Sequence, residues 1–321
     1  MGINNILLIG SGQIAGGYDS PDSKKVLTHL GAINNIITEK IIIDIVEPEL
    51  SNYLSIKNKW NITGKHYYSI KEIKLSKYDI ILITCNTSYH FEIIKYSVEN
   101  INCKIILCEK PCCSNLDEII NVDKLCKSKD IKLYVNYQRR LISEWNLIKN
   151  EIGTGGMGEF QFGNVYYSKG LVNNCSHAIN LILYIFNKFD LSIKNIFEHF
   201  YDYSKSDPTL TFSLELNDKV INFIGLNDQN FSIFEIDLIF QKARIKCIDS
   251  GTIIRRYYLS EDSLYSGFKS LNYIKNKDDK TEPFLNLWRI IESKEFYKLE
   301  DISINEAINT FRLLNELKIK C

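Results

Sequence analysis

The first 137 residues alternate between short, continuously apolar runs and longer segments in which apolar side chains recur every three or four positions. Short continuous runs are typical of buried parallel strands, and the three-to-four spacing is typical of helices. The alternation therefore predicts an α/β domain over residues 1–137, built on a doubly wound parallel sheet. The expected strands are residues 6–9, 41–46, 78–84, 104–108 and 131–135.

The pattern changes after Arg140, where strand-like runs begin to follow one another directly. Several such runs lie between about residue 209 and residue 259, with Asn217-Asp218 and Asn227-Asp228 as expected turns. We therefore expect a second, α+β domain with an open, mainly antiparallel sheet over residues 138–321. Its further expected elements are a strand at residues 160–167 and helices at residues 141–152, 176–186, 284–292 and 305–317.

Composition limits the classes of partner. Lys and Arg together number 39, as do Asp and Glu, so no net charge attracts the chain to nucleic acid or to an anionic membrane. No apolar stretch reaches the roughly 18 residues that span a bilayer, and the N-terminal residues lack the basic region of a leader, so we expect a cytoplasmic protein. The nine cysteines contain no C-x-x-C pair, which favours reduced thiols and no metal site.

A glycine-rich turn follows the first expected strand. Residues 10–15 fit the pattern G-x-G-x-x-G/A, whose glycines let the backbone approach a pyrophosphate. The position directly after a strand indicates a Rossmann dinucleotide-binding domain, although a turn needed only for tight packing is the alternative. The residues expected to contact the cofactor here are Gly10, Gly12, Gln13, Ile14 and Ala15.

Glu47 ends the second expected strand, where a carboxylate would accept hydrogen bonds from the adenosine ribose and repel a 2′-phosphate. The expected cofactor is therefore NAD(H), with NADP(H) as the alternative. Asp44 is the rival acid, but it lies within the strand, where an unpaired carboxylate is costly to bury. Glu47 lies about 35 residues beyond Gly12 rather than the usual ~20, so residues 16–28 must hold an insertion before the first helix.

The loop after the third strand should lie against the dinucleotide through Cys85, Asn86, Thr87 and His90. His90 is at least as well explained as a residue of the first helical turn that forms local hydrogen bonds.

Glu109-Lys110-Pro111 closes the fourth expected strand, at the edge of the sheet where small molecules bind. Glu109 and Lys110 are therefore candidates for cofactor contact, and the alternative is a surface ion pair before a helix. A capping box formed by Ser114 and Asp117 is expected to begin that helix.

Together these segments resemble the Gfo/Idh/MocA oxidoreductase family. The resemblance rests on the glycine turn, Glu47-Pro48, Glu109-Lys110-Pro111, residues 136–140 and residues 170–177. It implies an N-terminal Rossmann domain, a C-terminal open sheet that often mediates oligomerisation, and a catalytic set of Lys, Asp and His. Lys110 matches the lysine and His177 matches the histidine, whereas Asn173 and Asn180 stand where related sequences often carry Asp.

The resemblance implies hydride transfer between nicotinamide and a hydroxyl or keto carbon of a sugar, cyclitol or nucleotide-activated sugar, with surface polysaccharide or glycoconjugate synthesis as one setting. Lys110 would hydrogen-bond the reacting oxygen, and His177, beside Asn173, would transfer its proton. Substrate contacts are expected from Tyr137, Arg139, Arg140 and Asn174, although Arg139 and Arg140 equally suit structural ion pairs.

Two other functions fit the same residues. One is an NAD-using enzyme with no net redox change, of the lyase or glycosidase type, and the other is a catalytically silent nucleotide-sensing protein. For each of these functions we expect a homodimer or homotetramer, because one broad sheet face would otherwise be left in water. The alternative is that the terminal helices cover that face. The apolar residues expected on that face are Ile221, Phe223, Phe234, Ile236, Leu238 and Phe240.

Overall fold

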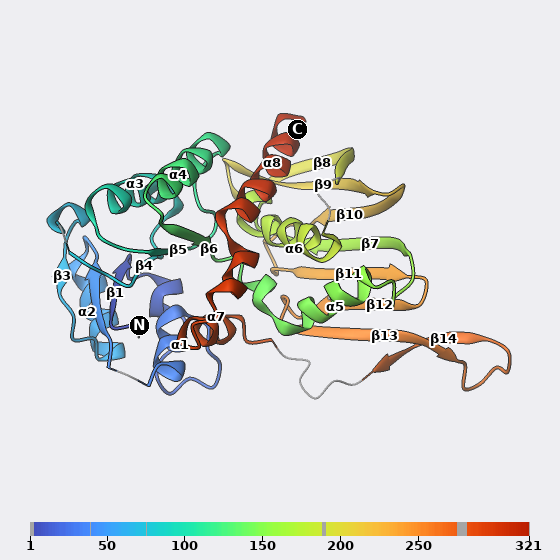
Figure 1. The fold of residues 1–321 in the computed structure, drawn as a ribbon. Helices are drawn as coiled ribbons and strands as arrows, with labels where there is room; N and C mark the ends of the chain where they lie inside the picture. The colour runs from blue at the N-terminus through green and yellow to red at the C-terminus, as the bar shows by residue number, and fades with distance from the viewer. Residues whose placement is uncertain (1–2, 39, 75, 188–190, 275–280, 321) are drawn as a thin grey trace. The chain divides into compact units, whose positions relative to one another are not determined.

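The computed structural model of the chain describes residues 3–38, 40–74, 76–187, 191–274 and 281–320 (Figure 1). The chain forms two compact units, the first from Met1–Leu141 with Glu282–Ile308 and the second from Ile142–Thr281 with Asn309–Cys321. The sequence suggested one boundary after residue 137. The difference arises because the helix Pro283–Glu292 buries its apolar side chains in the first unit, where Trp288 contacts His29.

The first unit is built on a six-stranded parallel sheet with the order β3-β2-β1-β4-β5-β6. The order reverses between β1 and β4, and such a reversal is the usual place for a ligand crevice in open α/β sheets. The five predicted strands are confirmed, and β3 is an additional short one. The strands are β1 (Asn5–Ile9), β2 (Ile42–Val46), β3 (His66–Tyr67), β4 (Ile80–Ile83), β5 (Ile105–Cys108) and β6 (Lys132–Val135).

The glycine turn does not open a long helix. Gln13–Gly17 forms a single π-helical turn, and α1 (His29–Ile36) begins only after Thr28, whose side chain accepts a hydrogen bond from Gly31 N at 3.0 Å. Asp19 holds the intervening loop by accepting hydrogen bonds from Leu27 N at 2.7 Å and Thr28 Oγ1 at 2.5 Å. The predicted insertion between the turn and the first helix is therefore present.

Of the other helices of the first unit, α3, α4 and α7 begin close to where the sequence predicts them, with one correction at α4, whereas α2 was not predicted. Asn115, not Ser114, caps α4 by accepting a hydrogen bond from Glu118 N at 2.9 Å, and Glu118 accepts from Ser114 N at 2.9 Å. The predicted Ser114–Asp117 capping box is wrong by one residue, because Asn caps as well as Ser does. These helices are α2 (Leu50–Trp60), α3 (His90–Asn100), α4 (Leu116–Ser128) and α7 (Pro283–Glu292).

The second unit contains an eight-stranded sheet with the order β14-β13-β12-β11-β7-β10-β9-β8, in which only β7 and β10 pair in parallel. The predicted mainly antiparallel sheet is confirmed. β8 was missed because three register shifts interrupt its two-residue period. The strands are β7 (Phe160–Tyr167), β8 (Ser192–Ser204), β9 (Asp207–Leu216), β10 (Lys219–Gly225), β11 (Phe234–Phe240), β12 (Ala243–Ile248), β13 (Ile253–Glu261) and β14 (Lys269–Ile274).

Helices α5 (Ser143–Gly153) and α6 (Ser176–Phe186) lie across one face of this sheet in Figure 1, and the C-terminal helix α8 (Ile304–Lys320) contributes its last turns to the same unit. Phe186 of α6 packs on Phe240 of β11, with ring centroids 6.2 Å apart. The expectation that the apolar sheet residues need a second chain to cover them is wrong, since all six are buried within one chain. They are Ile221, Phe223, Phe234, Ile236, Leu238 and Phe240.

None of the helices described is both long enough and apolar enough to cross a membrane.

Candidate functional site

The two glycines of the glycine turn are required for different reasons. Gly10 has φ +89°, and a Cβ atom there would lie 2.7 Å from the Cα of Cys85, so packing against the loop after β4 demands glycine. A Cβ atom on Gly12 would meet nothing within 4 Å. The chain's own packing therefore does not explain Gly12, whose open side leaves room for a ligand to approach the backbone, as a dinucleotide pyrophosphate does in this motif.

Two residues of α2 hold the far end of this turn. Lys59 Nζ donates hydrogen bonds to the carbonyl oxygens of Gly16, Gly17 and Asp19 at 3.1, 3.0 and 3.2 Å, and Trp60 Nε1 donates to Gly16 O at 2.9 Å. Because these donors satisfy carbonyls at the end of the turn, they fix its orientation. Sequence reasoning missed both residues, which lie more than forty positions away from the turn.

Glu47 joins the end of β2 to the glycine turn. Its side chain is buried, and its Oε2 accepts hydrogen bonds from Ser11 N at 2.9 Å and Ser11 Oγ at 2.8 Å. The second oxygen, Oε1, accepts from Glu49 N at 3.1 Å. Glu47 therefore lies where a ribose-binding carboxylate is expected, beside the turn.

Asp44, the rival acid, is occupied elsewhere. It is buried and accepts hydrogen bonds from Tyr78 Oη and Lys65 N, each at 2.7 Å. Burial and this hydrogen bond to Asp44 raise the pKa of Tyr78 far above its ordinary value. Asp44 therefore bonds to Tyr78 and Lys65, whereas Glu47 bonds to Ser11 of the glycine turn.

His90 links two loops of the expected cofactor site. Its ring is buried, with Nε2 3.0 Å from the carbonyl oxygen of Cys85 and Nδ1 3.0 Å from that of Pro111. Burial alone lowers the pKa of His90, but the hydrogen bonds to Cys85 and Pro111 outweigh it and raise the pKa above its usual value. Both ring nitrogens lie within hydrogen-bond distance of carbonyl oxygens of the chain, so His90 helps to align these two loops.

The rest of that loop forms a short turn. Asn86 Oδ1 accepts hydrogen bonds from Ser88 N and Ser88 Oγ, both at 3.1 Å, and so caps the 3₁₀ turn Thr87–Tyr89. Cys85 packs against Gly10, as described above. Of these residues, Cys85 lies beside the glycine turn through its contact with Gly10.

Glu109 and Lys110 follow β5 at the same edge of the sheet. Glu109 is buried, and its carboxylate contacts His29 Nε2 at 2.9 Å, Asn136 Nδ2 at 2.6 Å and Lys110 N at 3.3 Å. Burial alone would raise the pKa of Glu109, but the hydrogen bonds from His29 and Asn136 and the charge of Lys110 lower it below the usual value. Lys110 itself is half-buried and precedes a cis peptide bond to Pro111.

Cys108 directly precedes this turn, and Cys126 lies in the following helix, α4. Burial raises the pKa of Cys108 above its ordinary value and that of Cys126 to about 12, so both are thiols near neutral pH. Within the described ranges, no cluster of three or more His, Cys, Asp or Glu side chains could hold a metal ion.

The residues after β6 divide between two roles. Arg140 is buried and donates to Glu306 Oε2 at 2.5 Å and to the carbonyl oxygen of Asp301 at 3.1 Å. These contacts favour a structural ion pair for Arg140 over contact with a substrate. Tyr137 is also buried, at 2 % exposure, whereas Arg139 is half-exposed. Of these three candidates, Arg139 is the one whose side chain reaches solvent.

In the second unit, Asn173, Asn174 and His177 lie on consecutive turns. Leu171–Cys175 is a π-helical turn that runs directly into α6, whose first turn contains His177. Asn173 Nδ2 donates to Lys169 O at 3.2 Å, and Asn174 Nδ2 donates to Ser168 O at 2.9 Å. Both amides therefore help to hold the turn. Asn180 lies deeper in α6, where it donates to Thr310 Oγ1 at 2.8 Å.

A carboxylate that was not predicted from the sequence holds this turn. Asp207, at the start of β9, accepts hydrogen bonds from Val172 N at 2.8 Å and from Asn173 N at 2.9 Å. Burial raises the pKa of Asp207 above its usual value, although these backbone hydrogen bonds oppose the shift. No periodic signal links positions 173 and 207, so only the fold could reveal the pair.

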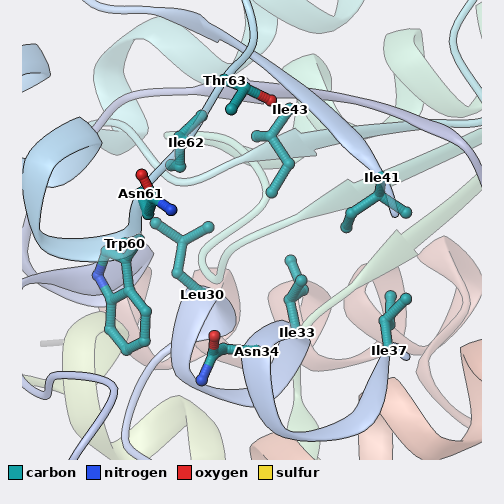
Figure 2. A pocket seen from close by; sticks show the side chains of 10 residues that line it. All are labelled: Leu30, Ile33, Asn34, Ile37, Ile41, Ile43, Trp60, Asn61, Ile62 and Thr63. Carbon is teal, nitrogen blue, oxygen red and sulfur yellow. The ribbon is translucent and has the colours of Figure 1, made fainter. Parts of the chain in front are cut away.

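The cavity shown in Figure 2 is lined by Trp60, which also donates to Gly16 O, but by no residue of 10–15. It has a volume of about 180 Å³ and is lined mainly by aliphatic side chains. Ile41 and Ile43 lie at the start of β2, whereas Glu47 follows its end, so the cavity is at the opposite edge of the sheet from the candidate site. Its lining residues are Leu30, Ile33, Asn34, Ile37, Ile41, Ile43, Trp60, Asn61, Ile62 and Thr63.

The first unit thus brings the glycine turn, Glu47, the loop after β4 and Lys110 to the carboxyl ends of β1, β2, β4 and β5. This arrangement defines a dinucleotide-binding Rossmann domain. Residues 4–137 match the family model GFO_IDH_MocA, which is described as "Oxidoreductase family, NAD-binding Rossmann fold". No curated protein sequence matches the chain.

Solved structures share the fold of nearly the whole chain. A dehydrogenase (MviM) from Clostridium difficile is 16% identical with a TM-score of 0.71, covering 99% of each chain. An oxidoreductase from Agrobacterium radiobacter, solved with NAD+, L-tartaric acid and magnesium, is 12% identical with a TM-score of 0.67, covering 97% of this chain and 94% of its own. The transcriptional regulator Gal80p from Kluyveromyces lactis is 16% identical with a TM-score of 0.72, covering 98% and 91%. The same fold therefore serves both dehydrogenases and a regulator.

Proposed function

We propose that the protein is an NAD(H)-dependent oxidoreductase that acts on a hydroxyl or keto carbon of a sugar, cyclitol or nucleotide-activated sugar. The observation that carries the proposal is Lys110 at the carboxyl end of β5, on the same sheet edge as a glycine turn whose Gly12 is open to a ligand. A lysine there can reach the reactive end of a dinucleotide held by that turn. The family of residues 4–137 supports the same class of chemistry.

Each candidate residue has its own role in the proposed reaction. Gly12 gives the pyrophosphate access to the backbone, and a bound nicotinamide would supply or accept the hydride. Lys110 hydrogen-bonds the reacting oxygen and transfers its proton, with His177 as the second proton-transfer group. Asn173 is neutral, so His177 receives no charge from that position, while Arg139 and Asn174 are the candidates for substrate contact.

NAD(H) is the preferred cofactor in this proposal. The carboxylate of Glu47 lies beside the glycine turn, where a 2′-phosphate would add a second negative charge next to it. Titration of the protein with both reduced cofactors measures the preference, and equal or tighter binding of NADPH would contradict the role given to Glu47.

A turnover screen tests the proposed activity. Absorbance of NADH is followed with free sugars, inositols and nucleotide sugars, each supplied in oxidised and reduced form, and Lys110→Ala serves as the matched control. Turnover that depends on Lys110 supports the proposal. Binding of NADH without turnover on any member of these classes would overturn it.

That second outcome would favour a nucleotide-sensing protein. Two observations support this candidate, the neutral Asn173 where related sequences often carry Asp and the shared fold with Gal80p, which is described as a transcriptional regulator. The retained Lys110 and His177 favour the enzyme.

A further inference from the structure

We propose that His29 and Trp288 form, with Glu109, a buried hydrogen-bond relay that positions Lys110, which makes His29 and Trp288 positioning residues of the reacting centre. The inference rests on the proposed function for the role of Lys110. All four residues belong to the first unit, and three of them come from segments far apart in the sequence, α1, the end of β5 and α7.

The relay fixes the proton on the His29 ring. Trp288 Nε1 lies 3.2 Å from His29 Nδ1, and an indole nitrogen can only donate, so Nδ1 must be the acceptor. The ring hydrogen is then on Nε2, which lies 2.9 Å from Glu109 Oε1. His29 is therefore a neutral donor to the carboxylate, and both rings are fully buried at 0 % exposure.

Glu109 is the junction of the relay. Asn136 Nδ2 donates to the same Oε1 at 2.6 Å, and Oε2 accepts from the main-chain nitrogen of Lys110 at 3.3 Å. Three donors hold the buried carboxylate in one orientation and stabilise its ionised form. The carboxylate therefore contacts the backbone of Lys110 itself.

Packing alone does not explain this network. His29 meets Phe284 edge-on at a centroid distance of 5.0 Å, so an apolar ring would fill the same space. Buried polar groups are costly unless every member is satisfied, and replacing such groups by apolar residues is often neutral or stabilising. This network is satisfied and ends at Lys110 N. It therefore fixes the negative charge of Glu109 beside Lys110, and that charge favours the ammonium form of Lys110.

The test measures the protonation of Lys110 and needs no substrate. Reductive ¹³C-methylation labels lysine amines, Lys110→Arg assigns the Lys110 signal, and its titration is followed by NMR in the presence of NADH. In Glu109→Gln the amine should lose its proton at lower pH than in the wild type, and His29→Leu and Trp288→Phe should shift it in the same direction by less. Unchanged titration in all three variants would overturn the relay.

Ring ¹⁵N shifts give a second readout. With His29→Gln as the assignment control among the five histidines, His29 should show a protonated Nε2 and a bare Nδ1 at pH 7. A protonated Nδ1 would contradict the proposed donor sequence.

Kinetics separate positioning from stability. His29→Leu should lower kcat about 10- to 100-fold with the KM for NADH nearly unchanged, because misplacing a reacting group costs about that much. Tyr78→Phe is the matched control, since it removes one buried hydrogen bond of the same unit, to Asp44, and leaves kcat unaltered. Equal losses in both variants would assign His29 to the fold alone. Absence of any turnover in the wild type would refute the proposed function, while the two NMR readouts would still decide the relay.

Discussion

At the scale of single residues, Lys110 concentrates the proposed chemistry. It is half-buried at the end of β5, whereas Gly10 of the glycine turn packs against Cys85. Lys110→Ala should therefore lower kcat by roughly the 10²–10⁴-fold typical of general acid–base groups, while the dissociation constant of NADH stays within about twofold. Stopped-flow turnover and fluorescence titration measure the two quantities. Full activity in Lys110→Ala would overturn the mechanism.

Glu109 makes the stability of the first unit depend on pH. Its pKa in the folded chain is lowered from the ordinary 4.5, so the stabilisation is present above pH 4.5 and is lost as pH falls through the folded value. A single proton changes the free energy of unfolding by at most about 1.4 kcal/mol per pH unit. The free energy of unfolding of the wild type, measured in urea, should therefore decrease as pH falls below 4.5. The same free energy should depend less steeply on pH in Glu109→Gln. Identical slopes would mean that Glu109 does not titrate with folding.

The sequence predicts the local part of the candidate site and not its supports. Gly10, Glu47 and Lys110 each follow an apolar run that ends at a turn, so a pattern of a few residues identifies them. Lys59, His29, Trp288 and Asp207 act across 34 to 259 positions of sequence, where no spacing rule applies. Arg140 was left open between two roles because its partner, Glu306, lies 166 positions away.

At the scale of elements, prediction succeeds where periodicity is unbroken. The strand at Phe160–Tyr167 and the helix at Ser176–Phe186 have the predicted bounds, because the first alternates and the second is mostly apolar and buried at every position. β3 has only two residues, too few to form a pattern, and the bulges of β8 disturb its alternation.

The contact of α2 with the glycine turn leads to a prediction about the cofactor. Lys59 Nζ holds three carbonyl oxygens at the end of the turn, so Lys59→Met should loosen the turn and weaken NADH binding about tenfold, equivalent to about 1.4 kcal/mol. Lys57→Met is the matched control on the same helix, since Lys57 lies over the ring of Tyr53 instead. Fluorescence titration of NADH compares the two variants, and equal affinities would remove Lys59 from cofactor binding.

At the scale of the whole molecule, the second sheet has one face that α5 and α6 do not cover in Figure 1. Its side chains are half-exposed and partly apolar. Phe162 of β7 pairs with Ile239 of β11, and Tyr166 of β7 pairs with Ile224 of β10. We therefore propose that a homodimer or homotetramer forms through this face, and not through the buried residues named from the sequence.

Sedimentation velocity at micromolar concentration measures the assembly. The wild type should sediment as a dimer or larger, and Tyr166→Lys should shift it to a monomer, because a charge placed in an apolar contact is costly to bury. Thr252→Lys, at an exposed position in the turn directly before β13, is the control. A monomeric wild type would reject the proposal.

The two glycines of the turn also differ in what selection would preserve. Gly10 is required by the neighbouring Cys85 and so by folding itself, whereas Gly12 has open space where its side chain would be. In descendants that abandoned the dinucleotide, Gly10 would persist and Gly12 would drift toward larger residues at no structural penalty. Retention of Gly10 would therefore indicate descent from this fold, whereas retention of Gly12 would indicate that the dinucleotide is still bound.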